Sequence, residues 1–170
     1  MAATQQQAPQ AKWSGKATSA ELKGLKADQI WPLWADFSNF HNWFPKLDTC
    51  RLVEGEPGRV GSVRLCVGKA AAEEEEAMWG KERLVEMDEE KRLMRYEVME
   101  SNVGLKGYVA AITVVEVEGE GGCRVEWSFE AEAVEGWEEE ALKGYVESSL
   151  ESIVKKMEEA LLNRSLIMIN

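Results

Sequence analysis

Apolar and polar residues alternate along most of the chain, which is the pattern of antiparallel strands with one buried face. We predict strands over residues 12–22, 49–54, 61–67, 77–86, 92–99, 107–117 and 123–133. The last strand has the clearest pattern, because its inward positions are Val125, Trp127, Phe129 and Ala131. Short turn sequences separate the last six strands, so we expect them to form a meander.

Helical spacing of apolar residues occurs in three other places. A short helix should begin close to Asp28, a good N-cap residue, because Pro32 is tolerated only near the first turn. A second short helix should span 38–44 and stop at Pro45. From 138 to 163 apolar residues recur every three or four positions, so this long helix should bury one face and expose its Glu/Lys-rich face.

This order of elements predicts an α+β fold of the helix-grip type. A curved antiparallel sheet of six or seven strands would wrap on the long C-terminal helix, with two short helices between strands one and two. One helix rarely fills a curved sheet completely, so an apolar cavity for a small ligand is expected. The domain should span 12–163, with a disordered tail at 1–11 and a C-terminal tail at 164–170.

The net charge of the chain limits the kinds of molecule that it can bind. The 170 residues include 31 acidic and 20 basic side chains, for a net charge of −11. Phosphate backbones and anionic membrane surfaces would repel such a chain, so we expect neither nucleic acid nor membrane as a partner. No stretch reaches the length of a membrane span, and the pattern does not predict an oligomeric state.

The reactive residues exclude several kinds of chemistry. Three widely spaced cysteines form neither a disulfide framework nor a CxxC metal pattern, which favours reduced thiols and a cytoplasmic location. Cys66 is interpreted as a small apolar filler. His41 is the only histidine, so a multi-histidine metal site is impossible. No glycine-rich nucleotide motif is present, and we expect no cofactor and no metal.

Three polar residues fall on the apolar sides of their strands. They are Arg64, Glu82 and Tyr108. A carboxylate aimed at an apolar surface costs several kcal/mol unless it is paired or neutralised. The pattern therefore indicates either a structural ion pair or a functional site, and it does not separate the two. If a site exists, Arg64 and Glu82 should lie within hydrogen-bonding distance inside one cavity.

Several strings along 12–161 resemble the plant lachrymatory-factor synthases and their close relatives, within the superfamily of START domains, birch-pollen-allergen-like proteins and polyketide-cyclase-like proteins. The matching segments are Lys12-Trp13-Ser14-Gly15-Lys16, Leu52-Val53-Glu54-Gly55-Glu56, Val60-Gly61-Ser62-Val63-Arg64, Trp79-Gly80-Lys81-Glu82-Arg83-Leu84-Val85, Val125-Glu126-Trp127-Ser128-Phe129 and Glu135-Gly136. The first-helix Pro32, the Ala-rich segment before Glu73 and the loop 101–107 depart from the family pattern.

The resemblance implies an isomerase that needs no cofactor. Its catalytic positions would be Arg64, Glu82 and Tyr108, and its reaction would convert an alkenyl (1-propenyl) sulfenic acid to a thial S-oxide. In that reaction a proton leaves oxygen and another reaches carbon. Glu82 could carry the proton, Arg64 could stabilise negative charge on oxygen, and Tyr108 could orient the substrate. Replacing Glu82 by Gln would then abolish turnover and leave the thermal midpoint nearly unchanged.

Apolar residues on the same faces are expected to form the core or the cavity wall. Those assigned to a ligand site are Trp34, Phe37, Met78, Leu84, Trp127 and Phe129. The ligand would be a small hydrophobic or organosulfur molecule. Two alternatives stay open. The cavity could carry a lipophilic ligand without turnover, or it could serve a related cyclase or isomerase that acts on another plant metabolite.

Overall fold

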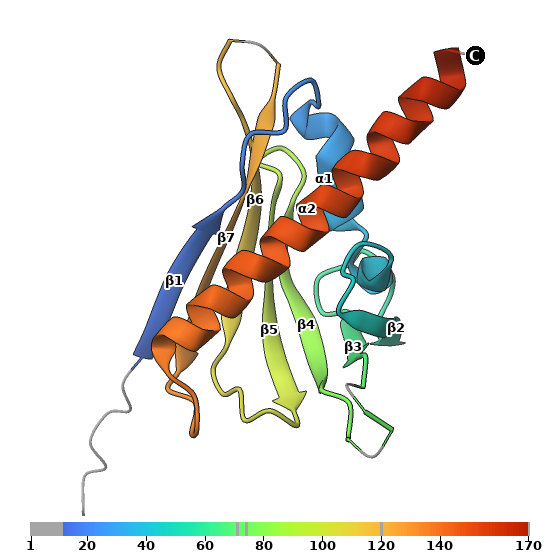
Figure 1. Ribbon diagram of the computed structural model, residues 1–170. Helices are drawn as coiled ribbons and strands as arrows, with labels where there is room; N and C mark the ends of the chain where they lie inside the picture. The colour runs from blue at the N-terminus through green and yellow to red at the C-terminus, as the bar shows by residue number, and fades with distance from the viewer. Residues whose placement is uncertain (1–11, 71, 74, 120, 170) are drawn as a thin grey trace, which may run out of the picture.

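The computed structural model describes residues 12–70, 72–73, 75–119 and 121–169 (Figure 1). The elements before the second strand are strand β1 (Lys12–Thr18), helix α1 (Ala27–Ala35) and a 3₁₀ helix, η1 (Phe37–Asn42). The remaining elements are β2 (Leu47–Glu54), β3 (Val63–Gly68), β4 (Trp79–Asp88), β5 (Leu93–Ser101), β6 (Val109–Glu116), β7 (Cys123–Glu132) and helix α2 (Glu139–Ile169).

The seven strands form one antiparallel sheet in the order β1-β7-β6-β5-β4-β3-β2. Strands β2 to β7 follow one another as a meander, whereas β1 pairs with β7. The segment that contains α1 and η1 therefore carries the chain from one edge of the sheet to the other. The predicted helix-grip architecture, with two short helical segments between the first two strands, is confirmed.

Helix α2 crosses the curved sheet diagonally, from β1 towards α1 (Figure 1). Its buried positions recur at helical spacing, as the sequence predicted, and include Leu142, Val146, Leu150, Ile153 and Met157. The helix continues to Ile169, beyond the end of the amphipathic pattern at 163. The domain boundaries stay a prediction, and the expected tail at 1–11 lies outside the described residues.

The first helix differs in detail from the expectation. It begins at Ala27, and the backbone N–H of Lys26 donates to the side-chain oxygen of Gln29 at 2.8 Å. Asp28 is therefore not the N-cap residue that we predicted, and its carboxylate accepts a hydrogen bond from Arg92 at 2.8 Å. Pro32 lies inside the helix, past the first turn. The second short helix, predicted over 38–44, is the 3₁₀ helix η1 and ends two residues earlier, at Asn42.

Gly15 in β1 allows the sheet and helix α2 to approach closely. A Cβ atom at this position would lie 2.7 Å from Cε1 of Phe129 and 3.1 Å from Cγ of Lys143 in α2. Both distances are shorter than ordinary van der Waals contacts, and Phe129 is fully packed in the core. The absence of a side chain at Gly15 is therefore a packing requirement where strand, sheet and helix meet.

We expect Gly15→Ala to lower the free energy of unfolding by about 1–3 kcal/mol, because the new methyl group overpacks this junction. Urea unfolding measures the change. Gly144→Ala is the matched control, because no atom lies within 4 Å of a Cβ at that exposed position in α2. Alanine favours a helix over glycine, so Gly144→Ala should be neutral or stabilising. Equal destabilisation by both substitutions would contradict this account of Gly15.

Candidate functional site

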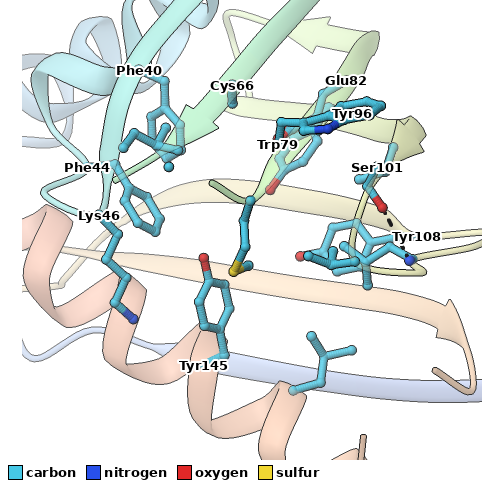
Figure 2. Close-up of a pocket in the computed structure, with 18 of the residues that line it drawn as sticks. Phe40, Phe44, Lys46, Cys66, Trp79, Glu82, Tyr96, Ser101, Tyr108 and Tyr145 are labelled. Atoms are coloured by element: carbon cyan, nitrogen blue, oxygen red, sulfur yellow. Dashed lines mark hydrogen bonds between the residues drawn. The ribbon is translucent and has the colours of Figure 1, made fainter. Parts of the chain in front are cut away.

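A cavity of about 310 Å³ lies between the sheet, the segment that joins η1 to β2, and helix α2 (Figure 2). Its walls are mainly apolar or aromatic, from Phe44 and Leu47 on one side to Val98 and Leu105 on another. The exposed residues Lys46, Lys69 and Met78 also line it, so the cavity reaches the surface beside them. This volume can hold a small organic molecule.

The charged pair in the wall comes from two neighbouring strands. Arg64 in β3 and Glu82 in β4 are direct partners in the antiparallel register. Nη2 of Arg64 donates a hydrogen bond to Oε2 of Glu82 at 2.9 Å. The Arg64 side chain is 1% exposed and that of Glu82 is 15% exposed. The predicted proximity of the two residues is confirmed, but only Glu82 lines the cavity.

Arg64 lies behind the cavity wall and is enclosed by aromatic rings. Its guanidinium carbon is 3.9 Å from the ring centre of Phe37, 4.7 Å from that of Phe40 and 4.9 Å from that of Tyr96. Nη1 also donates to the backbone oxygen of Phe37 at 2.8 Å. Burial acts to lower the pKa of Arg64, but the Glu82 carboxylate, together with the smaller effects of Cys66, Cys50 and Tyr96, raises that pKa overall. Arg64 therefore stays charged and fixes the position of Glu82.

The backbone around Glu82 is irregular on the side of β5. The register shifts between Lys81 and Glu82, and it shifts again between Leu84 and Glu86. Such bulges bend a strand and change the direction of its side chains. The carboxylate of Glu82 is thus held by Arg64 on one side while its own strand curves around the cavity. Its Oε1 atom accepts no hydrogen bond from the described residues, so this oxygen is free to meet a ligand.

Three phenol hydroxyl groups accompany Glu82 at the cavity. Tyr96, Tyr108 and Tyr145, the three tyrosines of the chain, all line it. Tyr108 stands directly before β6, and its ring stacks on Phe129 with the centres 5.8 Å apart and the planes at 11°. Tyr145 enters from α2, on the opposite side from the strand residues (Figure 2). Burial raises the pKa of each tyrosine, so all three are neutral donors at ordinary pH.

The predicted cavity residues divide into two groups. Met78 and Trp127 line this cavity, together with Glu82 and Tyr108. The structure places the other four elsewhere in the core, away from this lining: Trp34, Phe37, Leu84 and Phe129. A periodic pattern identifies the buried face of a strand or helix, but it does not tell how far along that face a cavity extends. All four side chains are buried, as expected, and their assignment to a ligand site stays a prediction.

Sequence reasoning missed the residues that the loops and α2 contribute. Lys46 has its Nζ atom 4.4 Å from the ring centre of Tyr145 and 3.3 Å from Oγ of Ser148. Phe44 packs edge-on against Phe40 with the ring centres 5.4 Å apart. The amphipathic pattern did include Tyr145 on the buried face of the last helix. No pattern in the sequence places Lys46 opposite that helix, because the contact with Ser148 joins residues 102 positions apart.

No metal centre is evident among the described residues. Within 12–70, 72–73, 75–119 and 121–169, no three His, Cys, Asp or Glu side chains gather closely enough to hold a metal ion. In the same residues no helix is both long and apolar enough to cross a membrane. The polar and reactive groups at the cavity include one carboxylate with its buried arginine, three phenols, the Cys66 thiol, the Ser101 hydroxyl and the lysines at the rim.

The fold and the cavity define a helix-grip protein with a largely apolar cavity between its sheet and its last helix. The profile of the polyketide cyclase/dehydrase and lipid transport family matches residues 17–161. The chain belongs to this family.

Solved structures share the fold. The protein XoxI from Bacillus cereus superposes with a TM-score of 0.69 at 22% identity, over 91% of this chain and 98% of that one. An uncharacterized protein from Bacillus thuringiensis gives 0.68 at 25% identity, over 89% and 99%. Ginseng major latex-like protein 151 from Panax ginseng gives 0.65 at 23% identity, over 87% and 97%. At these identities the likeness concerns the fold alone.

The burial of Arg64 changes the expectation for Glu82→Gln. The substitution removes the negative charge that balances a cation of 1% exposure, so it should destabilise the fold by about 1–3 kcal/mol. Glu82→Leu, which also removes the acceptor, should cost about 3–5 kcal/mol. Urea unfolding of both variants measures these losses. We therefore expect a lower thermal midpoint for Glu82→Gln, and not the nearly unchanged one that the resemblance implied.

A double-mutant cycle separates the pair from its surroundings. Arg64→Met combined with Glu82→Leu replaces both charges by apolar side chains, so it should cost clearly less than the sum of the two single substitutions. If the losses in the free energy of unfolding were additive, the two side chains would be energetically independent. That result would contradict the hydrogen bond of 2.9 Å between them.

Alkaline titration tests the burial of the phenols. We expect little phenolate absorbance from the folded protein at pH 10, where a free tyrosine is about half ionised. Since the folded pKa values are raised, the stabilisation is complete below the unfolded value near 10 and is lost as the pH rises through the folded values. Ultraviolet difference spectra and urea unfolding follow the two effects. Ionisation of three tyrosines near pH 10 without unfolding would contradict the assignment.

Proposed function

We propose that the protein binds a small, largely apolar molecule in this cavity and moves a proton on it through Glu82. The observation that supports this most strongly is the position of the carboxylate. Glu82 is held by a buried arginine on one oxygen, while its side chain lines a cavity of otherwise apolar and phenolic character. In such surroundings a carboxylate can accept a proton from one atom of a substrate and return it to another.

The proposed reaction is the isomerisation that the sequence resemblance implies. An alkenyl (1-propenyl) sulfenic acid would lose its S–OH proton to Glu82 and gain a proton at carbon, which gives the thial S-oxide. The atoms balance without a cofactor, because the substrate and product are isomers. The size of the cavity and its few polar groups suit a substrate with a short alkenyl chain and one polar end.

Each polar group would have a distinct role in this proposal. Glu82 would be the catalytic residue that carries the proton, and Tyr108 would donate a hydrogen bond to the substrate oxygen. Arg64 would act as a positioning residue, because its guanidinium group is enclosed by Phe37, Phe40 and Tyr96. Direct stabilisation of the substrate oxygen by Arg64, as the resemblance implies, has less support, since Arg64 is not part of the cavity lining.

A cytoplasmic location of the protein also remains a prediction.

A carrier without turnover is the second candidate. The family description includes lipid transport, and the wide apolar lining would serve an inert lipophilic ligand equally well. The carboxylate would then hold Arg64 within the sheet and do no chemistry. A cyclase or isomerase for another plant metabolite would use the same groups on a different substrate. An assay of product formation distinguishes an enzyme from a carrier that only binds its ligand.

The test is an incubation with an alliinase-type lyase and 1-propenyl cysteine sulfoxide, with detection of the thial S-oxide in the gas phase. We expect product from the wild-type protein and a loss of about 10²–10⁴-fold in Glu82→Gln, because the proton carrier is removed. Gly144→Ala is the control with an intact site. All assays should be run at a temperature at which circular dichroism shows the Glu82→Gln variant folded.

Two outcomes would overturn the isomerase. One is full activity of the folded Glu82→Gln variant, which would remove the role of Glu82. The other is no product from the wild-type protein although it binds a lipophilic fluorescent probe in the cavity. That second result would favour the carrier.

A further inference from the structure

Two cysteines on the neighbouring strands β2 and β3 form a pair beside the charged site. Cys50 in β2 and Cys66 in β3 are direct partners in the antiparallel register. Their Sγ atoms lie 3.2 Å apart, both residues are buried, and both thiols are free. Direct partners across an antiparallel pair have Cα separations that a disulfide can bridge. The third cysteine, Cys123, lies in β7 and has no part in this pair.

The pair can be reached through the cavity although neither residue is exposed on the outer surface. Cys66 lines the cavity, on the wall close to Phe40 (Figure 2). It follows Arg64 by two positions, so both side chains are on the same face of β3. A molecule much smaller than the cavity volume of about 310 Å³ can therefore approach one of the two sulfur atoms.

The surroundings of the pair favour one thiolate. The hydrogen bond from the thiol of Cys66 lowers the pKa of the Cys50 thiol to about 7, against the effect of burial, and the charge of Arg64 acts in the same direction. The same hydrogen bond and burial raise the pKa of Cys66. One sulfur of the pair thus ionises easily while its neighbour keeps its proton. A thiolate beside a thiol is the arrangement that reacts with oxidants.

We propose that Cys50 and Cys66 are a modification site, at which hydrogen peroxide entering through the cavity forms a reversible disulfide between β2 and β3. Either sulfur can hold the proton that the pair shares, so Cys66, which faces the cavity, can attack one peroxide oxygen as the thiolate, which gives a sulfenic acid and releases hydroxide. The second sulfur attacks the sulfenic acid sulfur, and the hydroxyl group leaves as water. The dithiol loses two electrons and two protons, and one peroxide is reduced to two waters. A thiol reductant restores the pair.

The disulfide would change one wall of the cavity. Strand β2 is at the edge of the sheet and pairs only with β3, with register shifts at both of its ends. The residues before it, Phe44, Lys46 and Leu47, line the cavity. A covalent bond from Cys50 to Cys66 fixes this edge and removes the free thiol from the wall. The proposal does not depend on proton transfer by Glu82, since the dithiol has no part in that step.

The experiment treats the folded full-length chain with hydrogen peroxide and counts free thiols after denaturation. Two of the three thiols should disappear together, with a mass decrease of about 2 Da, and dithiothreitol should restore them. Peptide mapping should find Cys50 joined to Cys66 and Cys123 free. The oxidised protein should also unfold at a higher urea concentration, because the cross-link restricts the unfolded chain.

Single variants provide the controls. Cys123→Ala should still lose its two remaining thiols as a pair, whereas Cys50→Ala and Cys66→Ala should form no internal disulfide. The count of free thiols in the wild-type protein tests the proposal even if one of these variants fails to fold. The proposal is overturned if peroxide leaves all three thiols free, if Cys123 is oxidised as fast as the pair, or if the mapped bond joins two chains.

Discussion

The burial of one positive charge is the constraint on which the site depends. Arg64 is almost completely enclosed by the sheet and by the aromatic rings of Phe37, Phe40 and Tyr96. A cation in such surroundings needs a partner of opposite charge, and Glu82 on the adjacent strand supplies it. The requirement fixes the carboxylate at the cavity wall. The ion pair that the buried Arg64 requires therefore also holds the Glu82 carboxylate, a group that can transfer a proton, at the cavity wall.

The cavity follows from the way the sheet and the last helix meet. Gly15 lets β1, Phe129 and α2 approach closely at one end of the helix. Further along, the bulges around Glu82 bend β4, and the segment before β2 completes the wall with Phe44 and Lys46. Close packing at one end and an irregular strand at the other leave space between them. The same elements that stabilise the domain therefore shape its cavity.

The sequence predicts well what depends on short repeats. The strand alternation gave the seven strands and placed Arg64 and Glu82 on one inward face, and the helical repeat gave the buried side of α2 with Tyr145. The sequence could not tell that Trp34 in α1 and Leu84 in β4 lie outside the cavity lining, since a periodic pattern identifies the buried face and not the position of a cavity along it. The sequence could not predict individual contacts between elements. The contact of Lys46 with Tyr145 joins the start of β2 to the last helix, and the contact of Cys50 with Cys66 depends on the register of β2 and β3.

The most direct test of the central claim is an NMR titration of protein labelled with carbon-13 and nitrogen-15 by 1-hexanol, a probe that has an alkyl chain and one hydroxyl group. The side-chain carboxyl resonance of Glu82 and the indole N–H resonance of Trp127 report on the two sides of the cavity. The account predicts that both shift together and reach saturation while other glutamate carboxyls stay constant. A shift of Trp127 without Glu82, or shifts spread over surface glutamates, would mean that this carboxylate does not meet a ligand.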